Sequence, residues 1–255
     1  MSEPLDNAVW YALTGPLARF AVGAPPALRF DDELAPFGAL PDAPDPAAWD
    51  ALRTLAGAGG MAVLFRTPVE VPAGWEVLAR MPCDQMLYAR AEPPVLTGRP
   101  ASAPPSELTG GPSATPPRPD DAADASVAAL DLGDDDAAEM QALVAATRPG
   151  PFATRTHRLG RYIGVRDRGR LVAMAGERLR VAGATEISAV CTEPAYQRRG
   201  LAAALVTRLV ADCLARGERA FLHVADDNHG ARRVYAALGF RVRARVDALI
   251  LRAPA

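Results

Sequence analysis

The sequence predicts an α/β protein in two parts joined by a Pro-rich segment, and three observations predict it. In the second half of the chain, runs of β-type residues alternate with amphipathic helical segments at 201–214 and 228–238. Residues 92–126 contain nine prolines among small and polar residues, which leaves little apolar surface to bury. The chain has 255 residues and an apolar fraction of 49%. That length and composition allow a core on each side of a linker.

Residues 1–91 are predicted to form a small α/β domain. Asp45 and Pro46 indicate the start of a helix that ends at Gly57, because Asp caps helices and Pro fits their first turn. Three β-type runs follow that helix, at residues 61–65, 75–80 and 85–90, and an interrupted helix is predicted over residues 6–20.

Residues 127–255 give the clearer pattern. Asp134 favours the start of a helix, since an acidic side chain suits the positive end of the helix dipole. Residues 168–169 mark a hairpin between two strands. The predicted strands are 127–132, 161–167, 170–180, 186–192, 220–224 and 241–251, and the predicted helices are 134–146, 201–214 and 228–238.

Charge is divided unevenly between the two parts. Residues 1–126 carry 8 Arg and 16 acidic residues, whereas residues 127–255 carry 20 Arg and 14 acidic residues. A positive second part suits an anionic ligand. Its basic residues are dispersed along the chain, so no nucleic-acid partner is predicted, and an RNA- or protein-binding module rests on the Arg surplus alone.

The cysteine and histidine patterns favour a cytoplasmic protein without a metal. Three scattered cysteines do not make a disulfide framework, and neither they nor the three histidines have metal-ligand spacing. No signal segment and no apolar run of about 18 residues occurs, so no membrane partner is expected. The cysteines and histidines concerned are Cys83, Cys191, Cys213, His157, His223 and His229. A monomer or a homodimer is predicted.

The most informative stretch is "EISAVCTEPAYQRRGLAAALVTRLV", residues 186–210. Here the chain leaves a predicted strand and enters a helix at Gly200, so the first N–H groups of the helix have no intrahelical partner and converge. Gly200 lets backbone approach an anion, and Arg198 and Arg199 add positive charge. Such a turn suits a diphosphate, although a positively charged helix start that binds nothing is the alternative.

A second stretch, "NHGARRVYAALGF" at residues 228–240, favours the diphosphate-binding alternative. Together the two stretches resemble the GNAT superfamily of N-acetyltransferases, and "EISAVCTEPAYQRRGLA" is similar to its FR47-like subgroup. The resemblance covers the second part of the chain. It implies a mixed, mostly antiparallel sheet flanked by helices and splayed between the strands at 186–192 and 220–224, with acetyl-CoA in that wedge.

The resemblance also implies the residues that hold acetyl-CoA. The strand backbone would pair with the pantetheine arm, the following turn would hold the diphosphate, and one asparagine would bond the arm. Ala202 replaces a commoner Gly, which the family pattern permits. The implied residues are Val190, Cys191 and Thr192 for the arm, Gln197, Arg198, Arg199, Gly200, Leu201, Ala202 and Ala203 for the diphosphate, and Asn228.

Two residues are predicted to move protons while an acceptor amine attacks the thioester directly. Tyr235 is the predicted general acid, because its phenol has an ordinary pKa near that of the departing thiol. Glu186 is the predicted general base, at the offset before Gln197 where histone-acetylating members of the superfamily carry their glutamate. Three alternatives remain open. Tyr235 would be an ordinary packing aromatic, Glu186 would be a solvated charge, or the amine proton would leave through a relay of water. Cys191 lacks a neighbouring base and is interpreted as core.

Several alternatives stay open at this point. The chain is predicted to be an N-acyltransferase with an amine acceptor, and the alternative is a non-catalytic acyl-CoA-binding sensor. Residues 1–91 are hypothesised to be a degenerate second copy of the fold. The segment 147–156 is implied to form the acceptor wall, where Arg148 and Arg155 would bind an acceptor carboxylate or simply end a helix.

Overall fold

A computed structural model describes residues 3–94 and 129–255 of the protein. Its helices are α1 (Ala8–Leu13), α2 (Pro46–Ala56), α3 (Ala137–Thr147), α4 (Leu201–Ala215) and α5 (His229–Leu238), with short 3-10 turns at Pro4–Asn7, Ala18–Phe20, Asp134–Asp136, Thr156–Leu159 and Pro194–Tyr196. Its strands are β1 (Ala21–Ala24), β2 (Ala27–Phe30), β3 (Phe37–Ala39), β4 (Met61–Arg66), β5 (Glu76–Tyr88), β6 (Leu130–Leu132), β7 (Tyr162–Asp167), β8 (Arg170–Val181), β9 (Ala184–Thr192), β10 (Arg219–Ala225) and β11 (Phe240–Arg252).

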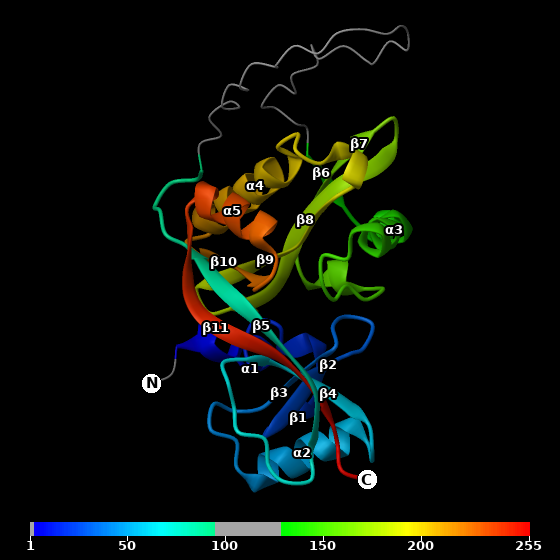
Figure 1. The fold of residues 1–255 in the computed structure, drawn as a ribbon, viewed down its shortest axis with the longest axis vertical. Coiled ribbons are helices and arrows are strands. Elements are labelled where there is room, and N and C mark those ends of the chain that lie inside the picture. Colours follow the sequence, from blue (N-terminus) through cyan, green and yellow to red (C-terminus); the bar gives the residue numbers. More distant parts are fainter. Residues whose placement is uncertain (1–2, 95–128) are drawn as a thin grey trace, which may run out of the picture.

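All eleven strands form one curled sheet (Figure 1). Their order is β1-β2-β3-β4-β11-β5-β10-β9-β8-β7-β6. Neighbours are antiparallel except for β3 with β4 and β9 with β10, which are parallel. Each parallel pair is joined by one helix, α2 or α4, as a parallel connection requires. The fold class predicted from the sequence is confirmed.

The two central strands are exchanged between the parts of the chain. β5 belongs to the first part but lies between β10 and β11 of the second. β11 belongs to the second part but lies between β4 and β5 of the first. In Figure 1 these two long strands run side by side between the lower and upper ends of the molecule. The two parts therefore share one hydrogen-bonded sheet.

The order of the sheet is nearly symmetric about this central pair. At one end the antiparallel strands β1 to β3 lead to the parallel pair β3–β4, and the exchanged strand β11 follows. At the other end the antiparallel strands β6 to β9 lead to the parallel pair β9–β10, and the exchanged strand β5 follows. Among the described residues the first part lacks a counterpart of β6, and it has no helix between β4 and β5 that would correspond to α5. This repeated arrangement places α2 where α4 lies in the second part.

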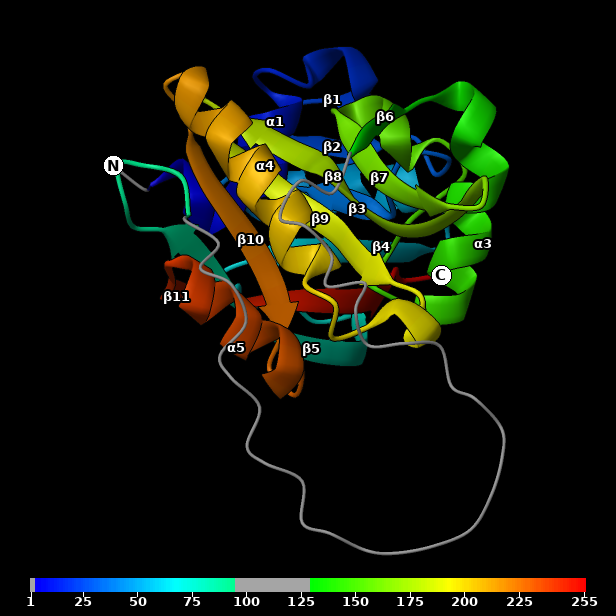
Figure 2. The same ribbon diagram turned by 90° about the horizontal axis from the view of Figure 1, so that it is seen from above.

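The core also crosses the boundary between the parts. One buried cluster combines α1, β2 and β3 with Leu179, Phe221 and Val246 from β8, β10 and β11. A second cluster packs α4 and α5 on the other face of the sheet, and Figure 2 shows these two helices on that face. Burial on both faces fixes the direction of each side chain of β8 to β10.

Most predicted elements of the second part are confirmed, and the first part contains the differences. Asp45 caps the start of α2, as predicted, and its side chain accepts a hydrogen bond from the Ala48 N–H at 2.8 Å. The two strands predicted at 75–80 and 85–90 are instead one strand, β5. Pro82 is tolerated within it because pairing with β10 begins only at Cys83. Strands β1 to β3 were not predicted.

The Pro-rich segment predicted at 92–126 lies mostly outside the described residues, so the division of the chain there stays a prediction. Within the described ranges, no helix is long and apolar enough to cross a membrane.

Candidate active site

A wedge opens in the sheet between β9 and β10. The two strands pair at three positions, from Arg219 with Ala184 to Phe221 with Glu186. Beyond Glu186, β9 continues to Thr192 without pairing to β10, while β10 pairs on its other side with β5 as far as Ala225. The splay predicted at this place is confirmed. The β9 backbone that faces the wedge, which includes Val190, Cys191 and Thr192, lacks a strand partner there.

A β-bulge changes the direction of β9 inside the wedge. The register with β8 shifts between the pairs Met174–Cys191 and Gly176–Ser188, and Ala189 has a left-handed φ of 50°. Such a backbone is unfavourable for a residue with a Cβ and is found preferentially next to functional sites. Nothing in the sequence signals it, because Ala189 is not a glycine.

The turn before α4 has an open backbone form, and its role in binding an anion stays a prediction. Arg198 and Gly200 adopt left-handed φ values of 63° and 80°. Apart from Gly200 itself and its two chain neighbours, no atom of the described residues lies within 4 Å of the place where a Gly200 Cβ would be. Since the Ala204 N–H bonds the Gly200 carbonyl at 2.9 Å, the three preceding N–H groups, of Leu201, Ala202 and Ala203, come before the helix's own ladder.

The arginines of this turn are arranged differently from one another. Arg199 donates to the Ala195 carbonyl at 3.1 Å and lies over the Tyr196 ring at 4.8 Å. Arg198 is exposed. Gln197 reaches back to the Thr192 carbonyl at 3.4 Å, which links the turn to the end of β9. The turn therefore offers positive charge at its surface beside converging N–H groups.

Helix α5 brings Asn228 and Tyr235 to the other side of the wedge. The Asn228 Oδ1 accepts from the Ala231 N–H at 3.1 Å and caps the helix. Tyr235 is 8% exposed and packs against Phe240 with ring centroids 6.0 Å apart. Burial, and next the neighbouring Cys191, raise the pKa of Tyr235 to about 12. Its phenol is therefore protonated at neutral pH, as a proton donor must be.

Glu186 lies at the narrow end of the wedge and is 0% exposed. The Arg178 guanidinium binds both of its oxygens, at 2.9 and 2.7 Å, and the His223 Nδ1 lies 2.7 Å from Oε1. Burial alone would raise the pKa of Glu186, but the Arg178 charge and the His223 hydrogen bond outweigh it and lower the pKa to about 2. The base role predicted for Glu186 stays a prediction, and these contacts weigh against it.

The low pKa of Glu186 predicts acid sensitivity. A depressed carboxyl pKa stabilises the fold above its ordinary value of 4.5, and this stabilisation is lost as pH falls toward 2. We expect the free energy of unfolding, measured with urea, to fall between about pH 5 and pH 2. Glu186→Gln should show a shallower fall, and the exposed Glu70→Gln should keep the wild-type dependence. If the free energy of unfolding of Glu186→Gln fell with pH as steeply as that of the wild type, the low pKa assigned to Glu186 would be contradicted.

Cys191 contributes its backbone to the wedge, and its thiol is buried. Burial raises the pKa of the Cys191 thiol to about 11, although hydrogen bonds from Thr147 and the Met174 backbone act in the opposite direction. The thiol is protonated at neutral pH, which suits the packing role predicted for it and disfavours a covalent acyl-enzyme.

The segment predicted as the acceptor wall is anchored to the first part of the chain. The Arg155 N–H donates to the Glu33 carbonyl at 2.7 Å, and its guanidinium pairs with the Glu33 carboxylate at 3.0 Å. The Thr156 hydroxyl donates to the Leu34 carbonyl at 2.6 Å. Arg148 ends α3 in a left-handed conformation, with φ 47°. Arg155 is thus engaged by an acidic partner that the sequence did not indicate.

The corresponding place in the first part is closed in two ways. The Asp45 carboxylate already occupies the start of α2, where α4 presents bare N–H groups. The Arg66 guanidinium fills the space beside the chain that leaves β3, where it donates to the Pro41 and Asp42 carbonyls at 2.7 and 2.8 Å. Asn7 donates to the Leu40 carbonyl at 2.8 Å. An added acyl-CoA chain would find these groups already bonded.

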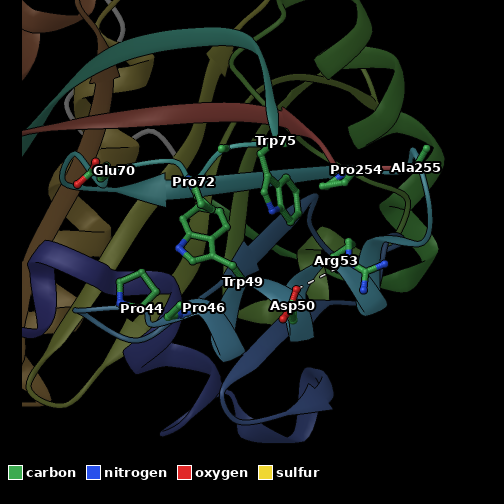
Figure 3. A pocket seen from close by; sticks show the side chains of 12 residues that line it. Pro44, Pro46, Trp49, Asp50, Arg53, Glu70, Pro72, Trp75, Pro254 and Ala255 are labelled. Atoms are coloured by element: carbon green, nitrogen blue, oxygen red, sulfur yellow. Dashed lines mark ion pairs between the residues drawn. The ribbon is translucent and has the colours of Figure 1, made fainter.

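A surface cavity of about 610 Å³ remains beside α2 (Figure 3). Trp49 and Trp75 pack edge to face on its lining with ring centroids 5.5 Å apart, and Pro44, Pro46 and Pro72 also line it. It lies away from the wedge. Because Asp45 caps the helix and Pro46 has no N–H, this cavity does not present the free N–H groups that lie at the start of α4.

Comparisons with known proteins agree with this geometry. A family model described as FR47-like protein matches residues 162–248. A solved protein from Novosphingobium aromaticivorans, assigned to the GNAT acetyltransferases, is 36% identical over 100% of both chains, with a TM-score of 0.77. The chain belongs to the GNAT family. A GCN5-related N-acetyltransferase from Kribbella flavida shares the fold at 21% identity, over 100% of this chain and 97% of its own, with a TM-score of 0.61. No curated protein matches the sequence.

Membership of the GNAT family confirms the resemblance found in the sequence, including its FR47-like character. The GNAT relative matches the whole chain and not the second part alone. The exchanged sheet is therefore the GNAT architecture to which residues 3–94 and 129–255 both contribute.

Proposed function

We propose that this GNAT protein transfers an acetyl group from acetyl-CoA directly to an amine acceptor, a small molecule or a peptide or protein amine. The observation that carries the proposal is the wedge between β9 and β10, which leads to an open turn at Gly200. An extended thioester arm fits an unpaired strand edge, and a diphosphate fits bare helix N–H groups with arginine nearby.

The proposed acetyl-CoA site combines strand, turn and helix. The backbone of Val190, Cys191 and Thr192 would pair with the pantetheine arm. Asn228 would bond the arm through its amide nitrogen, since its Oδ1 caps α5. The diphosphate would be held by the turn formed by Gln197, Arg198, Arg199, Gly200, Leu201, Ala202 and Ala203.

In the proposed reaction the acceptor nitrogen attacks the thioester carbonyl carbon, and the C–S bond then breaks. Backbone N–H near Val190 would polarise the carbonyl oxygen. The Tyr235 hydroxyl would donate a proton to the departing thiolate. The nitrogen's proton would leave through water, because the Glu186 oxygens are bonded to Arg178 and His223. We propose a single displacement without a covalent enzyme intermediate.

A non-catalytic acyl-CoA sensor is the second candidate, and the engaged Glu186 favours it. The two functions differ in one measurement. Acetyl-CoA with a library of amines, followed by detection of free thiol, should give turnover if the protein is an enzyme. Binding of coenzyme A in calorimetry without turnover of any amine would support the sensor instead.

We propose that residues 1–91 are a degenerate copy of the second part, residues 127–255. The mirrored strand order and the α2–α4 correspondence support this. The groups that close the first part, Asp45 and Arg66, imply that one chain binds one acetyl-CoA. The contacts of the first part with the segment 147–156 support a further role of residues 1–91 as part of the acceptor wall.

Gly200→Ala is expected to weaken coenzyme A binding at least tenfold. The new Cβ lies where the diphosphate would approach, and the left-handed φ of 80° also strains any residue other than glycine. Calorimetry with coenzyme A measures the effect. Gly183→Ala is the matched control, since Gly183 has a φ of 72° and equally open surroundings in the turn between β8 and β9. Equal weakening in both variants would contradict the proposed diphosphate site.

Tyr235→Phe is expected to lower kcat about 10²- to 10³-fold, the usual loss for a general acid, and to leave the Kd for acetyl-CoA nearly unchanged. Tyr88→Phe provides the control, because Tyr88 is a buried tyrosine that also packs on Phe240, with ring centroids 5.3 Å apart. If Tyr235→Phe kept the wild-type kcat, the acid would have to be another group.

A further inference from the structure

A row of polar side chains crosses five neighbouring strands on the side of the sheet that faces α1. Arg178 of β8 binds Glu186 of β9, which contacts His223 of β10. The His223 Nε2 lies 3.0 Å from the Gln85 Nε2 of β5, and the Gln85 Oε1 accepts from Arg243 of β11 at 2.6 Å. The row follows the sheet order β8-β9-β10-β5-β11 without a gap.

This polar row is buried among apolar side chains. Glu186 and Gln85 are 0% exposed, and the side chain of His223 is 5% exposed. The Phe65 ring lies 4.4 Å from the His223 ring, and Phe37 stacks on the Arg178 guanidinium at 5.1 Å. Each buried polar group in such a place must be paired, so the proton positions are strongly constrained.

The orientation of the Gln85 amide follows from two neighbours. The Leu5 carbonyl, 2.8 Å from Nε2, can only accept a hydrogen bond, and Arg243 can only donate to Oε1. Gln85 Nε2 is therefore a donor toward His223. It follows that His223 Nε2 must accept, and that the ring proton lies on Nδ1, which donates to Glu186.

His223 also connects the two strands of the wedge. Backbone pairing between β9 and β10 stops at Glu186 with Phe221, and the hydrogen bond from His223 to Glu186 joins the same strands at that point. The row ends outside the sheet, where Arg243 pairs with Glu3 at 3.0 Å and with Asp6 at 2.5 Å. The first turn of the chain thus holds the row at its far end.

We propose that His223, kept by Gln85 as the neutral form protonated on Nδ1, is a positioning residue that sets how far β9 and β10 diverge and thereby the fit of acetyl-CoA. The positioning role rests on the proposed function, whereas the proton position does not. His223 would act through Glu186 and the strand β9, and no direct contact with the thioester or the acceptor is proposed for it.

The proton position is tested by ¹⁵N NMR of the labelled protein at neutral pH. His223 is assigned from the signal that His223→Asn loses. We expect Nδ1 to be protonated and Nε2 to be unprotonated. A ring protonated on Nε2, or on both nitrogens, would overturn the proposal whatever the enzyme's activity. In Gln85→Leu, a population of His223 protonated on Nε2 should appear. If the protonation of the His223 ring stayed unchanged in this variant, Gln85 would not be the group that fixes it.

The positioning role is tested by calorimetric Kd values for coenzyme A. His223→Phe loses the bond to Glu186 and should bind about tenfold more weakly, the loss of roughly one good hydrogen bond. His223→Asn keeps a donor near Nδ1 and should stay within about threefold of wild type. If His223→Phe does not fold, Glu186→Gln, which weakens the same link, takes its place with the same expectation.

Arg66→Met is the matched control, because it removes a buried guanidinium from the first part without touching the wedge. It should lower Tm and leave the Kd unchanged. Equal Kd values for wild type and His223→Phe would overturn the positioning role, as would equal weakening in Arg66→Met. Absence of coenzyme A binding by the wild type would instead overturn the proposed function.

Discussion

The fragments 3–94 and 129–255 are each expected to be unfolded or aggregated alone and to form a folded complex when refolded together. Without β5, the second part loses the strand between β10 and β11, and without β11 the first part loses the strand between β4 and β5. The β5–β11 ladder alone runs from Phe240 with Tyr88 to Arg252 with Glu76. Circular dichroism and size-exclusion chromatography of the separate and mixed fragments measure the outcome.

A suitable control for this experiment is the full chain cleaved once within residues 95–128, which keeps both strands in place. It should elute as one particle and melt cooperatively. The expectation would be contradicted by a monomeric, cooperatively folded fragment 129–255. In that case the exchanged strands would not be needed for folding, and the second part would be independent.

Arg178→Met is expected to lower the free energy of unfolding by about 3–5 kcal/mol, the usual cost of leaving one partner of a buried ion pair alone. Arg178 and Glu186 are 7% and 0% exposed, so the remaining carboxylate would stay buried without its cation. The double variant Arg178→Met with Glu186→Leu should recover much of this loss, because no lone charge remains. Urea unfolding at neutral pH gives the three values.

Arg170→Met serves as the exposed counterpart. Arg170 pairs with Glu193 at 3.0 Å, but its side chain is 60% exposed, so its loss should cost less than about 1 kcal/mol. If Arg178→Met cost no more than this, or if the double variant cost the sum of its parts, the buried pair would not have the assigned role.

Local sequence signals were sufficient for three helix starts and one hairpin turn, two of the helix starts lying beside the wedge. Asp45, Gly200 and Asn228 each mark a helix start, and the hairpin turn at residues 168–169 has left-handed φ at both positions. These features depend on residues near one another in the chain. The turn at Gly200, which we propose to hold a diphosphate, was recognised for the same reason.

Several features that depend on distant segments were not predicted, whereas the splay of β9 from β10 was implied by the family resemblance. Strands β1 to β3 are only three or four residues long, too short for a period to show. The exchange of β5 and β11 depends on which strands pair with each other, and the residues of a single strand do not encode its neighbours in the sheet. The engagement of Glu186 follows from Arg178 and His223 on other strands, although a charged residue inside the buried run of β8 was a usable signal.

The exchanged strands also affect the order in which the protein can fold during synthesis. β4 and β5 leave the ribosome long before β11, whose place lies between them. Until β11 arrives, both strands present backbone edges that other nascent chains can pair with. Pairing over such a long stretch of chain is slow. We therefore expect folding yield in cells to depend on protection of the half-made polypeptide, and co-expressed chaperones should raise it.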